Sequence, residues 1–146
     1  MFRPHDLVFL FWFLCFFAVA YWHLTNEPAK LQQGIPSDTV TAYVYKVTKD
    51  NTILAIIDGK SYTVRLQGIM ISTTREARWF LKEKVTGQQV ALEYDEQARD
   101  EKGNILAYVW LRGEMVNHTM VAKGYARAFQ TPDQTMYIKV LKQAQK

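Results

Sequence analysis

The chain has 146 residues, a formal net charge of +4 and 49% hydrophobic residues, so it can hold one soluble domain of about 100 residues and little besides. Its single cysteine, Cys15, excludes an intramolecular disulfide and any metal site made of several cysteines. From residue 39 onwards there are 16 Lys and Arg residues and 11 Asp and Glu, and this excess of +5 is compatible with an acidic partner but also with an ordinary solvated surface.

The first part of the chain is an apolar, aromatic segment at residues 7–24. It has no charged residue, and as a helix it would measure about 27 Å, close to the thickness of about 30 Å of a hydrocarbon core. Tyr21 and Trp22 stand where interfacial aromatic residues are common. A cleavable signal peptide is the alternative, because Ala18-Val19-Ala20 has the small-x-small form of a cleavage site. We expect a retained transmembrane helix.

The composition divides the chain into four segments. Residues 1–6 are an N-terminal tail, 7–24 the transmembrane helix, 25–38 a polar linker with two prolines and a glycine, and 39–146 the soluble domain. An N-terminal anchor of this kind predicts a single-pass membrane protein. The mitochondrial inner membrane and a bacterial inner membrane both fit, and the residues do not distinguish between them.

Strand and helix patterns follow one another along the soluble domain. Alternating apolar and polar residues predict five strands, and Asp58-Gly59 is typical of a hairpin between the second and third. Helical spacing predicts three helices, the first of which begins with a capping box of Thr73 and Glu76. The strands are expected at 40–48, 52–57, 60–68, 89–94 and 105–111, and the helices at 74–85, at 115–123 and after the Thr-Pro-Asp-Gln turn at 131–134. This order indicates an α+β fold, and five strands without free edges fit a closed OB-type β-barrel.

Four short blocks resemble the staphylococcal nuclease-like, or thermonuclease, domains. They are Val-Arg-Leu-Gln-Gly-Ile at 64–69, Asn-Ile-Leu-Ala-Tyr-Val at 104–109, Gly-Glu-Met-Val-Asn at 113–117 and Lys-Gly-Tyr-Ala at 123–126. Their order and spacing extend the resemblance over residues 39–146. The resemblance implies an OB-type barrel of five strands with three helices, in agreement with the element order.

The resemblance also implies where a catalytic site would lie. Active members hydrolyse phosphodiester bonds with calcium, using acidic metal ligands, a glutamate and two arginines. Arg65 matches one arginine, whereas the two metal aspartates fall at Asn51 and Met70, the glutamate at Thr73 and the second arginine at Asn104. Calcium prefers carboxylates to an amide and a thioether, and threonine is no general base near neutral pH. On this ground we expect no catalytic residues, no metal and no cofactor, which would make the chain a pseudo-nuclease.

The sequence therefore predicts a non-catalytic, membrane-anchored module that serves as an accessory, structural subunit of a membrane protein complex. Its expected partners are other membrane-protein subunits, contacted by the transmembrane helix and the barrel, and the lipid bilayer. One alternative is a non-cleaving nucleic-acid-binding OB-type domain at a membrane, and another is an active calcium-dependent nuclease. In the predicted function Arg65 pairs with Asp50 or with another acid near the mouth of the barrel, and nucleic acid is a less favoured partner.

Overall fold

The computed structural model describes residues 34–132 and 136–145. The predicted N-terminal tail, the transmembrane helix at 7–24 and most of the linker lie outside these ranges. None of the helices within the described ranges has the length and hydropathy of a membrane span. The elements are β1 (Val40–Val47), β2 (Ile53–Ile57), β3 (Lys60–Leu66), β4 (Ile69–Ile71), α2 (Arg75–Val85), β5 (Gln89–Glu93), β6 (Ile105–Leu111), β7 (Glu114–Met115), α3 (Val116–Ala122), β8 (Ala126–Ala128) and α4 (Ile138–Ala144).

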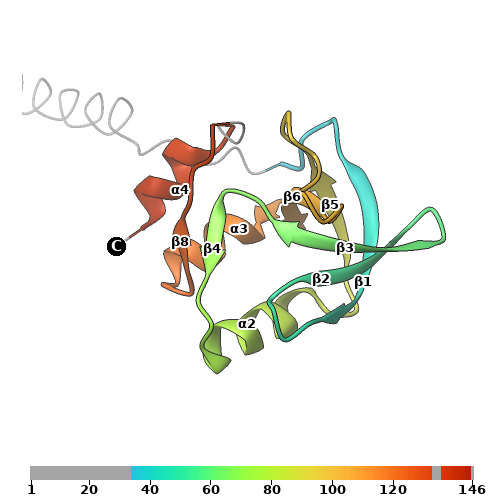
Figure 1. Ribbon diagram of the computed structural model, residues 1–146, viewed down its shortest axis with the longest axis horizontal. Coiled ribbons are helices and arrows are strands. Elements are labelled where there is room, and N and C mark those ends of the chain that lie inside the picture. Colours follow the sequence, from blue (N-terminus) through green and yellow to red (C-terminus); the bar gives the residue numbers. More distant parts are fainter. Residues whose placement is uncertain (1–33, 133–135, 146) are drawn as a thin grey trace, which may run out of the picture. The chain divides into compact units, whose positions relative to one another are not determined.

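Five strands form a closed barrel, as the sequence predicts (Figure 1). The strands follow the order β3-β2-β1-β5-β6 through antiparallel pairs, and a parallel pairing of β3 with β6 closes the ring. Successive side chains of a strand point to opposite faces of the sheet. In β1, Ala42 and Val44 are therefore buried inside the barrel, whereas Tyr43 and Tyr45 are exposed. Every residue of β6 is buried. The predicted five-stranded OB-type barrel with three helices is confirmed.

Helix α2 begins one residue later than the predicted capping box. The side-chain oxygen of Thr74, not of Thr73, accepts a hydrogen bond from the backbone N–H of Ala77. Two adjacent threonines can each fit the capping pattern, and only the observed backbone conformation distinguishes them. Of the apolar stripe that the spacing predicts, Ala77, Leu81 and Val85 are buried, whereas Phe80 is only partly buried.

Three very short strands were not predicted. Strand β4 pairs with β8 in a separate two-stranded sheet, and β7 extends the edge of the barrel sheet beside β6. Each has only two or three residues, which is too few to show a period of two in a sequence. In Figure 1, β4 and β8 run side by side between the barrel and α4. The predicted turn at 131–134 falls partly outside the described residues, and α4 begins at Ile138.

A buried asparagine on α3 ties the end of β3 to β6. The Asn117 side chain is fully buried, and its Oδ1 accepts a hydrogen bond of 2.9 Å from the backbone N–H of Val109. Its Nδ2 donates to the backbone oxygen of Gln67 at 2.8 Å and to that of Ala107 at 3.3 Å. The Asn117 side chain thus satisfies buried backbone groups both at the end of β3 and in β6, the two strands that close the barrel.

Gly68 turns the chain from β3 into β4 and has no room for a side chain. Its φ is +73°, and a Cβ there would lie 2.9 Å from Leu141 Cδ1 and 3.3 Å from Tyr108 Cε1. We expect Gly68→Ala to lower the free energy of unfolding by about 2–4 kcal/mol. An alanine is strained at this positive φ, and its Cβ would also overlap with the side chains of Leu141 and Tyr108. Urea denaturation measures the change.

Gly87 provides a matched control for this substitution. Its φ is +76°, but nothing lies within 4 Å of a Cβ built there. Gly87→Ala should therefore cost only the backbone contribution, about 1 kcal/mol. Equal losses for the two variants would show that the contacts around Gly68 do not matter.

Candidate functional site around Arg65

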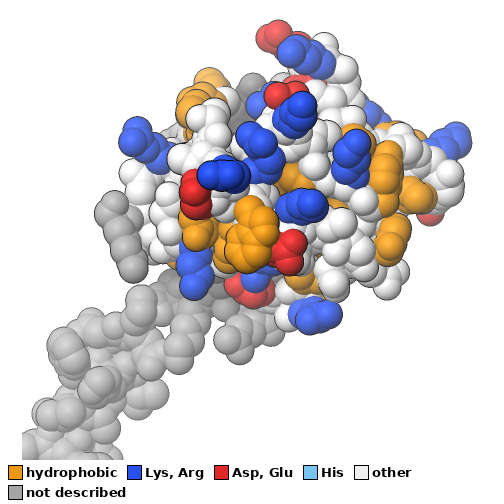
Figure 2. Space-filling view, turned by 90° about the horizontal axis from the view of Figure 1, so that it is seen from below, with side chains coloured by type: hydrophobic (Ala, Val, Ile, Leu, Met, Phe, Trp, Pro, Cys, Tyr) orange, Lys and Arg blue, Asp and Glu red, His pale blue; other side chains and the backbone are white. Residues whose placement is uncertain are grey.

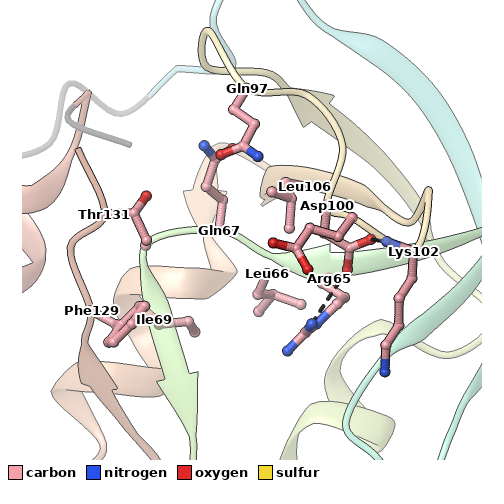
Figure 3. Close-up of a pocket in the computed structure, with 12 residues that line it drawn as sticks. Arg65, Leu66, Gln67, Ile69, Gln97, Asp100, Lys102, Leu106, Phe129 and Thr131 are labelled. Atoms are coloured by element: carbon pink, nitrogen blue, oxygen red, sulfur yellow. Dashed lines mark hydrogen bonds and ion pairs between the residues drawn. The ribbon is translucent and has the colours of Figure 1, made fainter. Parts of the chain in front are cut away.

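Two adjoining clefts meet at the end of β3, where Arg65 points outwards. Both are lined by Arg65, Leu66, Ile69 and Phe129. The first, which we call the Arg65 cleft, has a volume of about 410 Å³ and is also lined by Gln67, Gly68, Gln97, Asp100, Glu101, Lys102, Leu106 and Thr131 (Figure 3). The second, which we call the turn cleft, has about 370 Å³ and is also lined by Lys49, Asp50, Asn51, Met70, Ile71 and Thr73.

Arg65 forms an ion pair with Asp100 and not with Asp50. Arg65 Nη1 lies 3.4 Å from Asp100 Oδ2, and the two side chains are 55% and 17% exposed. The predicted pairing with an acid near the barrel mouth is thus present, with Asp100 as the partner. Because the pair is long and open to water, it orients the guanidinium but leaves most of its donors available for another anion.

Asp100 is itself held by neighbouring donors. Its Oδ1 accepts hydrogen bonds from the backbone N–H of Lys102 at 3.0 Å and of Asn104 at 2.9 Å, and its Oδ2 accepts from Asn104 Nδ2 at 2.9 Å. Burial opposes ionisation of this carboxyl, but the hydrogen bonds from Asn104, Arg65 and Lys102 outweigh it and lower its pKa below the usual value. Asn104, expected at the position of a second arginine, therefore lies behind Asp100 and orients it.

The lowered pKa of Asp100 predicts how stability depends on acidity. A carboxyl whose pKa is lower in the folded state stabilises the fold above its unfolded pKa of about 3.9, and this contribution disappears as pH falls through the folded pKa. We expect the Asp100→Asn variant to show a shallower loss of unfolding free energy below about pH 4 than the unchanged protein. Urea denaturation at a series of pH values measures it. Glu101→Gln, an equal charge change at an exposed neighbour, serves as the control, and identical acid profiles for both variants would contradict the prediction.

The turn cleft brings together three of the positions singled out from the sequence. Asn51 lies in the turn between β1 and β2 at a φ of +57°, and its Nδ2 donates to the backbone oxygen of Ser72 at 3.1 Å. Among the described residues, Asn51 Oδ1 is buried and has no hydrogen-bond partner. Met70 is 58% exposed on β4, and Thr73 is exposed just before α2. These side chains line one cleft with Arg65, as the strand–turn–helix order predicts.

The donors in this cleft do not fit a calcium ion bound in the way that the resemblance implies. Calcium takes six to eight oxygen ligands, several of them carboxylates. Within residues 34–132 and 136–145, no group of three or more His, Cys, Asp or Glu side chains could hold a metal ion. The turn cleft offers the carboxylate of Asp50 and the amide of Asn51, while Met70 contributes only a soft thioether.

Sequence reasoning missed Gln67. The strand pattern places it on the outer face, yet β3 ends at Leu66 and Gln67 is only 1% exposed. Its backbone N–H donates to the oxygen of Ala107 at 2.9 Å, which continues the pairing with β6 beyond the end of the strand and turns the side chain inwards. A pattern of local alternation contains no signal for this long-range contact.

A family model described as staphylococcal nuclease homologue matches residues 63–146. The chain belongs to this family. It is similar to the thermonuclease of Staphylococcus hyicus, with 38% identity over 118 residues that cover 73% of this chain and 69% of the relative. The thermonuclease of Staphylococcus intermedius is 37% identical over 114 residues, covering 70% and 68%. Endonuclease YncB of Bacillus subtilis (strain 168) is 30% identical over 134 residues, covering 78% and 64%.

These relatives correct the functional prediction. The expectation of a pseudo-nuclease acting as a non-catalytic accessory subunit is wrong, because the relatives are named thermonuclease and endonuclease and therefore favour an enzyme. The assignment of Asn51, Met70, Thr73 and Asn104 to altered positions of the nuclease homologue family stays a prediction. So do the predicted membrane location and the contacts with other membrane-protein subunits.

Proposed function

We propose that this nuclease homologue cleaves phosphodiester bonds of nucleic acids at the junction of the two clefts. The observation that carries the proposal is the Arg65 guanidinium, half-exposed on the wall that both clefts share. A guanidinium in this position can bind two phosphate oxygens at once and stabilise the charge that develops on them. The names of the related thermonucleases and endonuclease support the choice of substrate.

The two clefts carry both signs of charge. Arg65, Lys49 and Lys102 are balanced by the carboxylates of Asp50, Asp100 and Glu101, so phosphate contacts would come from the individual cationic side chains and not from an overall positive charge. Figure 2 shows Lys and Arg side chains spread over one face of the domain, with Asp, Glu and apolar side chains exposed among them. Contacts of this kind attract the phosphate backbone without regard to sequence and weaken as salt is added.

The hydrolysis itself can be assigned to residues of the two clefts. Arg65 holds the phosphate, and Asp100 keeps the guanidinium directed towards it. Asp50 supplies the carboxylate of the turn cleft, where it takes a proton from the attacking water as the oxygen of that water forms a bond to phosphorus, and Asp50 then releases this proton to solvent. The bond from phosphorus to the leaving oxygen breaks, and that oxygen takes a proton from solvent. No step uses calcium, because the cleft does not fit it.

A cleavage assay tests the proposal. The full chain is incubated with end-labelled single-stranded and duplex DNA and RNA, once with a chelator and once with added calcium. We expect cleavage that declines with rising salt and proceeds equally in both conditions. Absence of product at a large excess of protein would overturn the proposed function. Cleavage only with calcium would overturn the metal-free route through Arg65 and Asp50.

We also propose that residues 7–24 anchor the nuclease in a membrane as a single-pass helix. The length of the segment and its lack of charged residues support this. Extraction of membranes at alkaline pH provides the measurement: an integral protein stays in the pellet, and release into the supernatant would contradict the anchor. The two compartments expected from the sequence, the mitochondrial and the bacterial inner membrane, stay predictions.

A further inference from the structure

The outer face of the sheet formed by β1, β2 and β3 carries a row of exposed side chains. Tyr43 and Tyr45 on β1 are 47% and 41% exposed, and Ile56 on β2 is exposed as well. Tyr43 is paired with Ile56, and Ile56 with Ser61 on β3. The hydroxyl groups of Tyr45 and Ser61 share a hydrogen bond of 2.7 Å. We call these four residues the tyrosine row. Apolar side chains exposed together in this way are typical of interaction sites.

A β-bulge adds a positive charge to this face. The pairing of β1 with β2 shifts between Val44 and Lys46, so Tyr45 is the extra residue of the bulge. Regular alternation after Val44 would direct Lys46 to the inside of the barrel. Instead Tyr45 and Lys46 are both exposed, although they are neighbours in the chain. The bulge therefore provides an aromatic ring and a cation on the same outer face.

The strands that form this face contain no acidic residue. Lys46, Lys60 and Arg65 are their charged residues, whereas Asp50 and Asp58 lie in the turns that connect them. In Figure 2 apolar side chains gather at the right, on the side where β1, β2 and β3 lie in Figure 1, with cationic side chains and an acid near them. Unlike the two clefts, the strand face thus has an excess of positive charge.

The tyrosine row continues into the candidate site along β3. Ser61, Thr63 and Arg65 alternate with the buried Val64 and so belong to one face of the strand. Four residues separate Ser61 from Arg65, about 13 Å at about 3.3 Å per residue. Thr63 between them is paired with the partly exposed Leu54, and neither is charged. A ligand bound at Arg65 can therefore extend to the tyrosine row without passing an acid on these strands.

The chemistry of this surface fits a single strand of nucleic acid. Unpaired bases stack on exposed aromatic rings whatever their sequence, and the phosphates between them are attracted to nearby cations. A duplex does not offer its bases in this way, because they are stacked on one another and paired. A second copy of the chain fits less well, since it would bring Lys46 and Lys60 of two equal faces together without an acid in either set of strands.

We infer that the tyrosine row binds unpaired bases of a single strand whose phosphate is held at Arg65, so that this nuclease prefers strands long enough to reach it. The inference rests on the proposed function, because Arg65 fixes one end of the path. It assigns Tyr43 and Tyr45 to the binding of long substrates without a preference for any base. The hydrolytic step stays with the residues of the two clefts.

Competition between oligonucleotides of different length tests the inference. The full chain binds a fluorescent twelve-residue dT oligomer with phosphorothioate linkages, which slow hydrolysis, and unlabelled dT2 or dT12 of the same chemistry displaces it. A dinucleotide bound at Arg65 is too short to reach the row. We expect dT12 to bind at least about 100-fold more tightly than dT2, since each stacked base contributes about tenfold. Tyr45→Ala should weaken dT12 about tenfold, and Tyr43→Ala, tested separately, should do the same.

Two further variants show which part of the residue matters. Tyr45→Phe loses the hydroxyl group but keeps the ring, and should bind dT12 as the unchanged protein does. Trp79→Ala is the matched control, because Trp79 is 62% exposed on α2 and lines neither cleft. It removes an exposed aromatic ring outside the row and should leave the affinity for dT12 unchanged. Thermal unfolding of each variant confirms that it is folded.

The outcomes separate this inference from the proposed function. If no oligomer binds at low salt, the proposed function fails and the inference fails with it. If dT12 binds no more than about tenfold more tightly than dT2, which its additional phosphates can explain, only the tyrosine row is overturned. It is overturned as well if folded Tyr45→Ala and Tyr43→Ala both bind dT12 normally, or if Trp79→Ala loses as much affinity as they do. A change of sedimentation coefficient in Tyr45→Ala without a loss of affinity would assign the row to contact between copies instead.

Discussion

The Arg65→Ala variant should lose at least about 100-fold in the rate of nucleic-acid cleavage, since the guanidinium is the group that stabilises charge on the phosphate oxygens. Its fold should be nearly unaffected, because the pair with Asp100 is exposed and such pairs contribute about 0–1 kcal/mol. Initial rates with labelled single-stranded DNA, together with thermal unfolding of the same preparations, measure both quantities. Arg65→Lys should recover part of the rate, because lysine keeps the charge but not the two-point geometry.

Arg112→Ala separates the local role of Arg65 from the overall charge. Arg112 is exposed beside β7, and its Nη2 donates to Gln88 Oε1 at 3.1 Å. It lines neither cleft, yet its removal changes the net charge by the same amount. We expect at most a small decrease in rate. Equal losses in Arg65→Ala and Arg112→Ala would mean that the arginines act only through long-range attraction, and the site proposed here would be abandoned.

The Asn117→Ala variant should have the largest effect on stability, a loss of about 3–5 kcal/mol in the free energy of unfolding. The substitution leaves the backbone N–H of Val109 and the oxygen of Gln67 without the side chain that satisfies them, in a part of the structure with no access to water. A domain of this size has a total stability of about 5–15 kcal/mol. Chemical denaturation followed by circular dichroism measures the loss.

His118→Ala supplies the comparison at the next position of α3. Its side chain is partly exposed, so the substitution should change the stability by no more than about 0.5 kcal/mol. A loss below about 1.5 kcal/mol for Asn117→Ala would show that water or a rearranged backbone replaces the amide. The hydrogen bonds of the Asn117 side chain would then contribute little to stability.

Much of the fold could be predicted because its elements are encoded locally. The alternation of apolar residues in β1 and the Asp58-Gly59 turn after β2 are visible within a few residues, and the strands and hairpin occur where they were expected. The parts that were missed depend on distant contacts. Strand β4 exists because it meets β8, and the burial of Gln67 depends on a bond to Ala107, 40 residues further along the chain.

The candidate site was predicted in part. The placement of Arg65 near the turn that holds Asn51 follows from the order of strand, turn and helix, and the turn cleft confirms it. The sequence alone could not show which acid of the loop pairs with Arg65. Asp100 is held in place by hydrogen bonds from Asn104, and these depend on the conformation of the whole loop. The functional prediction failed because it treated a few altered side chains as decisive, although similarity to the named nucleases extends over most of the chain.

The closing pair of the barrel has a consequence for the order of folding events. Strands β3 and β6 pair in parallel, with Arg65 opposite Leu106 and Leu66 opposite Ala107. One wall of the Arg65 cleft therefore comes from β3 and another from β6. These residues are far apart in sequence, so pairing β3 with β6 carries the entropic cost of closing a long loop, and we expect this pairing to form late. A nucleotide bound there spans contacts formed late, and should therefore lengthen the lifetime of the folded state while leaving the rate of refolding unchanged.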